Sequence, residues 1–569
     1  MRWLVRGALG VAAALLCGCA VAALPAAVAA GAAAAAGDPV PSEAGRAAKK
    51  GELSLSVRWP PRQAQLLPLS AERVDFDLMR EQTLVATASA LRPAGTGAST
   101  ASLVVDAGAY TVAARARSGP GLAVTVATAS LPVTVAPSVR TSVTLTLAPA
   151  YRPVVTGLTP AAGRTGDTLT LSGSNLGLTW AATPTVTFSG DGASVSAPVT
   201  SYASEAATVT VPPWARGGAV EIVVDGVAAN AGTYAPLPSL FTSYFCATYD
   251  LTNAANDTTS RANTGNPERH LAALFASAAS TIDVALYELD EPSLVAALVA
   301  AKLRGVTVRA VAEKDNAFDA SGNATSGFAD LAAAGIPIVP DTRTSALMHN
   351  KFVVVDAAKA WTGSFNLTVN GAFRQNNNAI SIANAALAAN FGSQFTQMFA
   401  NNKFGSSKTA GVPNPAVAIE GATVSTLFSP KDQIAARIVS EINEARSGIK
   451  FMAFSFTSSA IGDAILARAA AGVAVEGVIE NTGASGTSGQ YPRFAAAGLD
   501  VRRDGNPSFM HHKVMVIDSA TVITGSYNFT GGAETNDENV LIFENAPELA
   551  ATYAAEFARV KATAIAAGN

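Results

Sequence analysis

The feature that most constrains the fold is an internal duplication in the second half of the chain. Matched segments recur there in the same order: apolar runs at 282–287 and 449–454, Gly-Val runs at 305–308 and 472–475, and Ala-Ala-Ala-Gly at 332–335 and 495–498. An alanine- and leucine-rich periodic segment follows each apolar run. Strands that alternate with helices indicate α/β architecture, so we expect two duplicated halves that form a pseudo-dimer around a central cleft.

Both copies end in the same polar pattern, His-x-Lys-x4-Asp followed by Gly-Ser-x-Asn. Its members are His349, Lys351, Asp356, Ser364 and Asn366 in the first copy, and His511, Lys513, Asp518, Ser526 and Asn528 in the second. Alternation along a strand places each His and Lys on one face. The residues between Lys and Asp are apolar, so the strand should be buried, and two polar residues at its start need a reason. The chain has only 4 histidines, and all but His270 lie in these two motifs, which favours a functional role for the motif histidines over simple packing.

These residue types suit the cleavage of a phosphodiester. Such a displacement needs a nucleophile, a general acid and positive charge around the non-bridging oxygens. His349 and His511 can supply the first two near neutral pH, and the lysines can supply the charge. Asn366 and Asn528 can add donors, as can the hydroxyls of Ser364 and Ser526. We find no cluster of carboxylates or of His and Cys, so the sequence predicts neither a metal nor a cofactor.

The double pattern resembles the phospholipase D superfamily over roughly residues 240–565. The resemblance implies a covalent mechanism, in which one imidazole attacks phosphorus to form a phosphohistidine and the other protonates the leaving oxygen. Water, activated by that second imidazole, then cleaves the intermediate. In two-copy relatives the first His is commonly the nucleophile, which assigns His349 as nucleophile and His511 as acid and base.

One position distinguishes the two halves. The stretch 536–539 resembles the Asn-x-Glu-Asn segment of the family, whose glutamate orients the catalytic His; here that residue is Glu538. The first half has Asn377 at the matching place. We therefore expect Glu538 to stand behind His511 and to stabilise its imidazolium, and we expect His349 to lack such support.

Asp356 and Asp518 have two interpretations. They can shape the electrostatics of catalysis, or they can be structural groups at the end of the strand. Five residues beyond Lys places each Asp about 16 Å along a strand that rises ~3.3 Å per residue, which favours the structural role. His512 alternates to the face opposite His511 and is expected to pack or to act behind the site.

The rest of the chain divides into segments of different character. We expect an export signal at 1–37, a linker at 38–50, a β-sandwich module at 51–149, a second β module at 150–238, and the two halves at 239–415 and 416–569. Period-two alternation with Gly and Pro punctuation indicates the β modules. The Gly-rich turns at 163–177 of the second module resemble the immunoglobulin-like IPT/TIG family. Such domains serve as spacers and as binding modules, so they do not define a function.

The N-terminus predicts export. Arg2 and Arg6 precede an apolar run of small residues, and Ala27-Val28-Ala29 offers a cleavage site. A lipobox-like sequence ends at Cys19, so the product can be secreted, periplasmic or lipid-anchored; an uncleaved anchor helix is the alternative. Cys246 is the one cysteine beyond this segment. A buried, inert thiol is favoured over a reactive one.

The substrate is less constrained than the reaction. Residues 239–569 contain 23 Lys and Arg against 29 Asp and Glu. A nuclease usually carries a basic groove, so the balance favours a phospholipid and possible contact with a membrane surface over nucleic acid. Arg374, Arg502 and Arg503 can still line a local basic groove, so a metal-independent endonuclease remains the alternative. A secreted surface-binding protein that works through the β modules is a third hypothesis.

Overall fold

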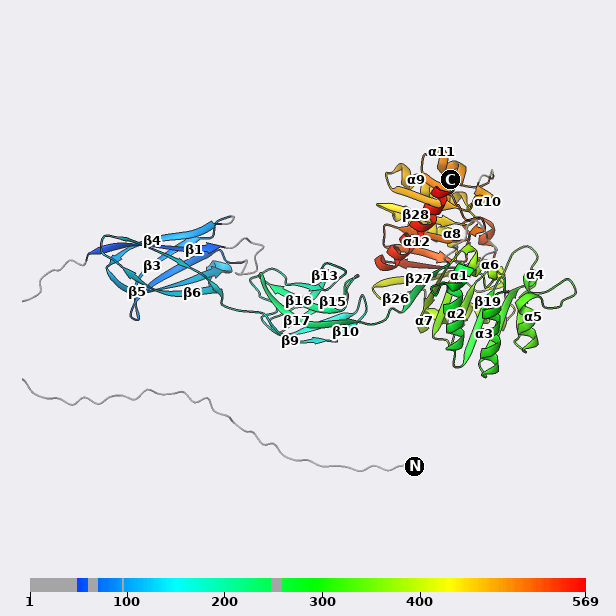
Figure 1. The fold of residues 1–569 in the computed structure, drawn as a ribbon, viewed down its shortest axis with the longest axis horizontal. Coiled ribbons are helices and arrows are strands. Elements are labelled where there is room, and N and C mark those ends of the chain that lie inside the picture. Colours follow the sequence, from blue (N-terminus) through cyan, green and yellow to red (C-terminus); the bar gives the residue numbers. More distant parts are fainter. Residues whose placement is uncertain (1–48, 60–69, 95–96, 247–257, 485, 487) are drawn as a thin grey trace, which may run out of the picture.

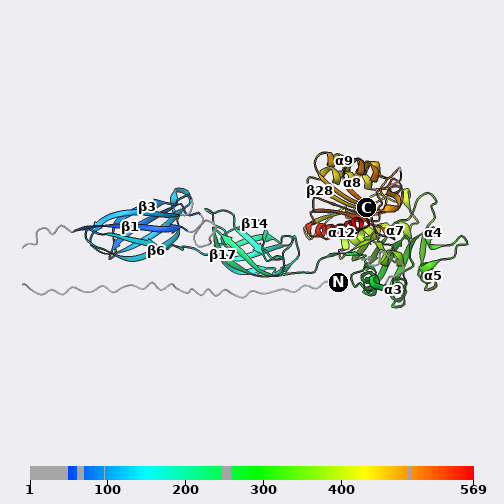
Figure 2. The ribbon, with the colours of Figure 1, turned by 45° about the horizontal axis from the view of Figure 1, so that its top comes forward.

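The computed structural model describes residues 49–59, 70–94, 97–246, 258–484, 486 and 488–569. The expected export signal, its cleavage site, Cys19 and most of the linker lie outside the described residues. Two β modules and an α/β region follow one another along the long axis of the molecule (Figures 1 and 2). The expected multidomain order, with β-rich modules before a duplicated region, is confirmed. Among the described residues, no helix is both long enough and apolar enough to span a bilayer.

The first module consists of two sheets around one apolar core. The strands are β1 (Lys50–Trp59), β2 (Arg73–Arg80), β3 (Thr83–Leu91), β4 (Gly97–Asp106), β5 (Gly108–Ser118), β6 (Val124–Val135), β7 (Arg140–Leu145) and β8 (Ala148–Pro149). They form the sheets β4-β1-β7 and β3-β2-β5-β6-β8. Every second residue of β1 and β2 is buried, for example Leu55 and Phe76, as period-two patterning predicts.

The second module is also built from two sheets. Its strands are β9 (Val154–Thr159), β10 (Ala162–Gly163), β11 (Thr168–Ser174), β12 (Thr185–Phe188), β13 (Val195–Ala197), β14 (Val199–Tyr202), β15 (Ala206–Thr210), β16 (Gly218–Val224) and β17 (Val227–Pro236). The sheet orders are β10-β17-β16-β12-β13 and β14-β15-β11-β9. This module contacts the α/β region directly, because Arg216 forms an ion pair of 3.1 Å with Glu548.

The first half of the α/β region contains one mixed sheet. Its strands are β18 (Phe241–Phe245), β19 (Thr281–Leu286), β20 (Thr307–Glu313), β21 (Ile338–Asp341), β22 (Phe352–Val355), β23 (Lys359–Gly363), β24 (Gln375–Asn376) and β25 (Asn378–Ile382), and its helices are α1 (Thr258–Ala262), α2 (Pro267–Ala276), α3 (Pro292–Leu303), α4 (Lys314–Ala317), α5 (Ser326–Ala333), α6 (Val369–Phe373) and α7 (Ala385–Phe399). Seven of these strands form the sheet, in the order β18-β25-β23-β22-β19-β20-β21, and β24 lies outside it.

The second half repeats this order. Its strands are β26 (Ala416–Ile419), β27 (Ala422–Phe428), β28 (Gly448–Ala453), β29 (Ala474–Ile479), β30 (Asp500–Arg503), β31 (Phe509–Met510), β32 (Lys513–Ile517), β33 (Thr521–Gly525) and β34 (Asn539–Glu544), and its helices are α8 (Ile434–Glu444), α9 (Ser459–Ala470), α10 (Asn481–Ala484), α11 (Tyr491–Ala496) and α12 (Pro547–Ala566). The sheet runs β26-β27-β34-β33-β32-β28-β29-β30, so its last seven strands match those of the first half one for one.

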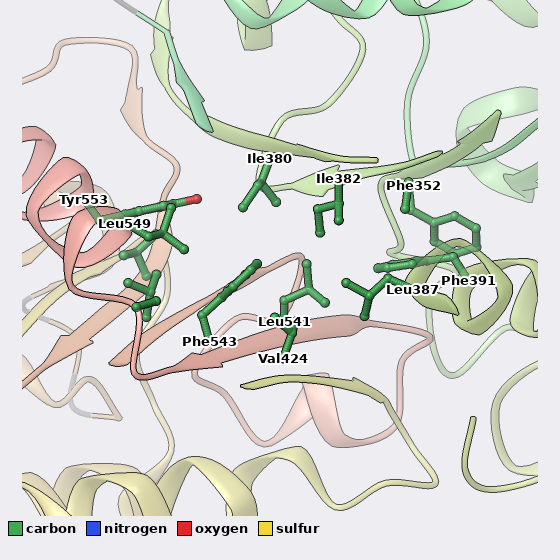
Figure 3. Packing of buried hydrophobic residues seen from close by; sticks show 14 of the residues in the cluster. Phe352, Ile380, Ile382, Leu387, Phe391, Val424, Leu541, Phe543, Leu549 and Tyr553 are labelled. Atoms are coloured by element: carbon green, nitrogen blue, oxygen red, sulfur yellow. The ribbon is translucent and has the colours of Figure 1, made fainter. Parts of the chain in front are cut away.

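The two sheets share a core that also takes in α7 and α12 (Figure 3). Ile380 and Ile382 from the first sheet belong to the same packed cluster as Leu541 and Phe543 from the second (Figure 3). Strand β22 explains why the motif strands are apolar without alternation. Successive residues of this strand alternate between the shared core on one face and the outer core of the first half on the other, so both faces of the strand are buried.

Candidate active site

The two His-x-Lys segments lie at the interface between the two halves of the α/β region, which is called the seam below. His349 stands just before β22, and its backbone N–H donates to the Asp537 carbonyl of the other half at 3.0 Å. In the matching place, the His511 N–H donates to the Asn376 carbonyl at 2.9 Å. Strands β24 and β31 pair in parallel across the same seam. Each catalytic candidate is therefore held by backbone from the opposite half.

The imidazole rings are also held across the seam, and here one expectation is wrong. Nδ1 of His349 lies 2.8 Å from Oε2 of Glu538, whereas Nδ1 of His511 lies 2.9 Å from Oδ1 of Asn377. The carboxylate thus supports His349, and His511 has the neutral amide. The expectation assumed that each orienting residue serves the His of its own half. The seam instead brings each one against the His of the other half.

Ser364 and Ser526 orient these groups. The hydroxyl of Ser526 donates to Glu538 at 2.7 Å, and that of Ser364 donates to Asn377 at 2.8 Å. Both serines are fully buried. The prediction that these hydroxyls donate to phosphoryl oxygens is therefore wrong, because each already donates its hydrogen to an orienting side chain.

Burial sets the protonation of the pair. It lowers the pKa of both His349 and His511 well below the ordinary value, with the two motif lysines adding to the shift. Burial also raises the pKa of the Glu538 carboxyl to about 7, against the lowering effect of Lys351. In the tautomer that carries its hydrogen on Nδ1, His349 donates to Oε2 of Glu538, and Nε2 keeps a free lone pair. Nδ1 of His511 faces only acceptors, so Nε2 is also the atom through which His511 exchanges protons.

The lysines present positive charge beside both imidazoles. Lys351 Nζ donates to the carbonyl of His349 at 2.7 Å, and Lys513 Nζ donates to that of His511 at 2.8 Å. An ammonium group has three hydrogens, so each keeps donors for a phosphoryl oxygen. Burial lowers the pKa of Lys351 to about 7 and that of Lys513 as well. A bound phosphodiester anion would oppose this shift and favour both charges.

Two aromatic residues of the site were missed by the sequence reasoning. Tyr287 lies with its ring 4.7 Å below Lys351 Nζ and 4.8 Å from the His349 ring. Phe454 does the same for Lys513 and His511, at 4.8 and 4.5 Å. Tyr287 directly follows β19 and Phe454 directly follows β28, at matching places in the duplicated runs 282–287 and 449–454. The aligned position of an aromatic residue in both repeats was the available signal.

Asn366 lies beside the Glu288 carboxylate, whereas the role of Asn528 as a donor in the site stays a prediction. Asn366 donates through Nδ2 to Oε2 of Glu288 at 2.9 Å, which leaves its second amide hydrogen available. Oδ1 of each asparagine is buried and has no hydrogen-bond partner among the described residues. Burial raises the pKa of Glu288, and the nearby Lys351 ammonium opposes the shift. The second half has Ser455 at the position of Glu288.

Asp356 and Asp518 lie at the far ends of β22 and β32. Asp356 accepts hydrogen bonds from the backbone N–H groups of residues 279–281, and Asp518 accepts the equivalent set from residues 446–448. These bonds lower the pKa of Asp356 to about 2 and also lower that of Asp518. A direct catalytic role is excluded by these positions. Both carboxylates hold a loop instead.

Two other residues behave as expected. His512 faces away from the site and its Nε2 lies 2.9 Å from Glu556, inside the shared core. Cys246 is fully buried and burial raises its pKa, which keeps the thiol unreactive. Among the described residues, no group of three or more His, Cys, Asp or Glu side chains is placed to hold a metal ion.

A duplicated α/β fold with two imidazoles, two ammonium groups and one orienting carboxylate at its seam is a site for a group bearing negative charge. A family model described as "Cardiolipin synthase, PLD-like domain" matches residues 271–399 and 438–561, and an IPT/TIG domain matches residues 153–240. The chain belongs to the phospholipase D superfamily, with an IPT/TIG domain before the catalytic region.

Three of its relatives carry names of phospholipid enzymes. "Phospholipase D" of Rickettsia bellii is 35% identical over 131 residues, covering 23% of this chain and 65% of that protein. "Phospholipase D" of Rickettsia conorii is 33% identical over 141 residues, covering 25% and 70%. "Mitochondrial cardiolipin hydrolase" of Chlamydomonas reinhardtii is 27% identical over 173 residues, covering 26% and 77%. The match thus spans about two thirds of the first two relatives.

Proposed function

We propose that the protein is a phosphodiesterase that works through a phosphohistidine on His349. The observation that carries this proposal is the pairing of Glu538 with Nδ1 of His349 at 2.8 Å. The pair directs the lone pair of Nε2 into the seam, and the carboxylate offsets the positive charge that develops on the ring when Nε2 bonds to phosphorus. The structural reason for His349 as nucleophile therefore differs from the one that the sequence suggested.

The chemical steps then follow from the two rings. Nε2 of His349 attacks phosphorus, and the P–O bond to the leaving alcohol breaks as His511, which enters this step as the imidazolium, gives its Nε2 proton to the departing oxygen. The negative charge of the bound diester favours this charged form against the lowering of the His511 pKa by burial. A water molecule next gives a proton to Nε2 of His511 and its oxygen attacks phosphorus. The P–N bond breaks, a phosphomonoester leaves, and both rings return to their starting states. Lys351 and Lys513 stabilise the charge on the non-bridging oxygens.

We propose phospholipids as the substrate class, with phosphatidic acid and a head-group alcohol as products. Three of the relatives are named for phospholipid hydrolysis. Glu288 adds a carboxylate to the wall of the site, and a second negative charge, on Asp290, lies beside it. A polyanionic strand would be repelled there, whereas a single diester with a neutral or cationic head group would not. Possible contact with a membrane surface belongs to this proposal.

Two of the arginines suggested for the basic groove of an endonuclease are engaged elsewhere. Arg502 donates to the backbone carbonyl of Asn569 at 3.0 Å, and Arg503 donates to the side chain of that residue at 3.2 Å. Both guanidinium groups are thus turned toward the C-terminal end of α12. They do not supply the positive track that a nucleic-acid groove needs.

Export is a further proposal, supported by the basic and apolar N-terminal segment. Secreted, periplasmic and Cys19-anchored forms all agree with it. The surface-binding hypothesis, in which the β modules are the working part, is retained only as an outcome of the test below.

The test compares three substrates with the purified mature protein. We expect turnover of bis(p-nitrophenyl) phosphate, faster hydrolysis of phosphatidylcholine vesicles, and little cleavage of single-stranded DNA. Glu288→Gln should raise DNA cleavage relative to lipid hydrolysis, and Ser455→Ala is the matched control on the other side. Rapid DNA cleavage with intact lipid would establish the nuclease alternative. Absence of turnover on all three would favour a surface-binding protein.

A further inference from the structure

A buried pair of carboxyl groups lies behind His511. Glu480 follows β29 and accepts a hydrogen bond from the Met510 N–H at 2.8 Å, directly before His511. Asp504 follows β30 and accepts from the N–H of Asn481, the residue after Glu480, at 3.0 Å. The two carboxyl groups also bond to each other. Glu480 is 3% exposed and Asp504 is 2% exposed, so both residues are almost completely shielded from solvent.

The first half has the same arrangement with a cation added. Glu313 accepts from the N–H of Met348 at 2.7 Å, directly before His349. Its companion Asp341 is bound by Arg343, with Nη2 and Oδ2 at 2.7 Å. Arg343 also pairs with Asp537, whose carbonyl holds the backbone of His349. Arg343 stands two residues after Asp341, and the second half has Asn506 two residues after Asp504.

Asn506 replaces the ion pair by neutral contacts that reach across the seam. Its side-chain Nδ2 donates to Oδ1 of Asn376 at 2.8 Å and to the Arg374 carbonyl at 3.0 Å. The Asn376 carbonyl is the group that holds the His511 backbone. A continuous set of contacts therefore connects the carboxyl pair to His511, through Met510 on one side and through Asn506 and Asn376 on the other.

In the part of the chain that the structure describes, the two carboxyl groups accept from N–H and hydroxyl donors, and no cation is paired with them. On β30, Arg502 and Arg503 bond to Asn569. On α12, Lys561 bonds to Glu476 and Asp500, and on the first half Arg374 presents its carbonyl. Beyond Met510 lie His511 and Lys513. Among the described residues, no Lys, Arg or His forms an ion pair with Glu480 or Asp504. Burial and the neighbouring Glu480 raise the pKa of Asp504 to about 7.

We propose that Glu480 and Asp504 are positioning residues that hold the segment 504–511, and with it His511, only while the Asp504 carboxyl is protonated. Loss of that proton places two negative charges in contact in a buried site, where repulsion is strong. The segment then loosens and His511 loses its alignment. The equivalent segment 341–349 keeps its position, because Arg343 neutralises its aspartate. The backbone segment that leads to His511 is therefore sensitive to pH, and the equivalent segment that leads to His349 is not.

Hydrogen exchange followed by mass spectrometry tests this directly, and the molecule contains its own control. After correction for the intrinsic rise of exchange with pH, we expect protection of peptides covering 504–511 to fall by about tenfold between about pH 6 and pH 8.5. Peptides covering 341–349 should keep their protection. Asp504→Asn, which is nearly isosteric and cannot ionise, should abolish the change. Equal loss in both segments, or the same loss in Asp504→Asn, would overturn the proposal.

A catalytic measurement gives a second arm, which rests on the proposed function. The kcat for bis(p-nitrophenyl) phosphate at saturation should fall from about pH 6.5 to pH 8.5 more steeply in the wild type than in Asp504→Asn. Other titrating groups of the site are common to both proteins, so the difference reports the carboxyl pair. Asn506→Arg, which imitates the first half, should flatten the profile in the same way. Identical profiles in all three would contradict the proposal, whereas no turnover in any of them would contradict only the proposed reaction.

Discussion

Glu538→Gln tests which imidazole forms the covalent bond. The change removes the charge that faces Nδ1 of His349 at 2.8 Å and leaves an amide of nearly the same shape. His349 would then have the kind of neutral partner that His511 has in Asn377. A hydrogen bond to a charged group contributes about 1.5–3 kcal/mol, and each 1.36 kcal/mol is a factor of ten in rate. We therefore expect formation of the phosphoenzyme to slow by roughly 10- to 100-fold.

Rapid mixing with bis(p-nitrophenyl) phosphate measures this step, since the burst of p-nitrophenolate reports formation of the phosphoenzyme. Loss of folding is not expected to confuse the result. Burial raises the pKa of Glu538 to about 7, so its ionised form lowers stability as pH rises toward that value, and an uncharged Gln removes the effect. The melting temperature of Glu538→Gln at neutral pH should equal or exceed that of the wild type.

Asn377→Glu is the matched control, because it places a carboxylate against His511. The burst rate should change by less than about threefold, and the slower decay of the phosphoenzyme should shift to higher pH as the carboxylate raises the pKa of His511. The opposite pattern would refute the reasoning. If Glu538→Gln leaves the burst intact and slows only the decay, His511 is the nucleophile and His349 the acid.

Four other outcomes are expected. His349→Ala and His511→Ala should each remove nearly all turnover, with the double variant hardly worse, since groups that act as a unit are not additive; half-activity in each would mean two independent sites. EDTA should leave hydrolysis of a soluble diester unchanged, and restoration by an added metal after inactivation would contradict this. Asp356→Asn should lower the free energy of unfolding by about 1–3 kcal/mol with little change in kcat. Because the pKa of Asp356 in the folded protein is depressed to about 2, the stability that this carboxylate contributes is present above about pH 4 and is lost as pH falls toward 2. Removal of residues 38–236 should preserve turnover of a soluble diester, measured on a monodisperse product.

The sequence predicts those features of the site that depend on a single copy of the repeat. Spacing alone identifies His349, Lys351 and their partners in the second half, and the apolar residues after each Lys predict a buried strand. It fails where the answer depends on the seam. Glu538 follows Ser526 closely in the chain, so sequence proximity assigns it to His511, but the pairing of the halves brings it to His349. Linear spacing does not show which half supplies each partner.

The same seam explains why the two halves have diverged where they have. Two departures from pseudo-symmetry fall around His511: Asn377 stands at its ring where His349 has a carboxylate, and Asn506 stands behind its backbone where the first half has an arginine. His349 keeps Glu538 at its ring, and Arg343 fixes the segment that holds it. A nucleophile needs a fixed position and a charge that offsets its own. An acid and base must lose and regain a proton in every cycle, and a neutral amide at Nδ1 does not hold the ring in its charged form. Duplication followed by substitutions on one side of the seam thus gives two chemically identical imidazole side chains different catalytic roles.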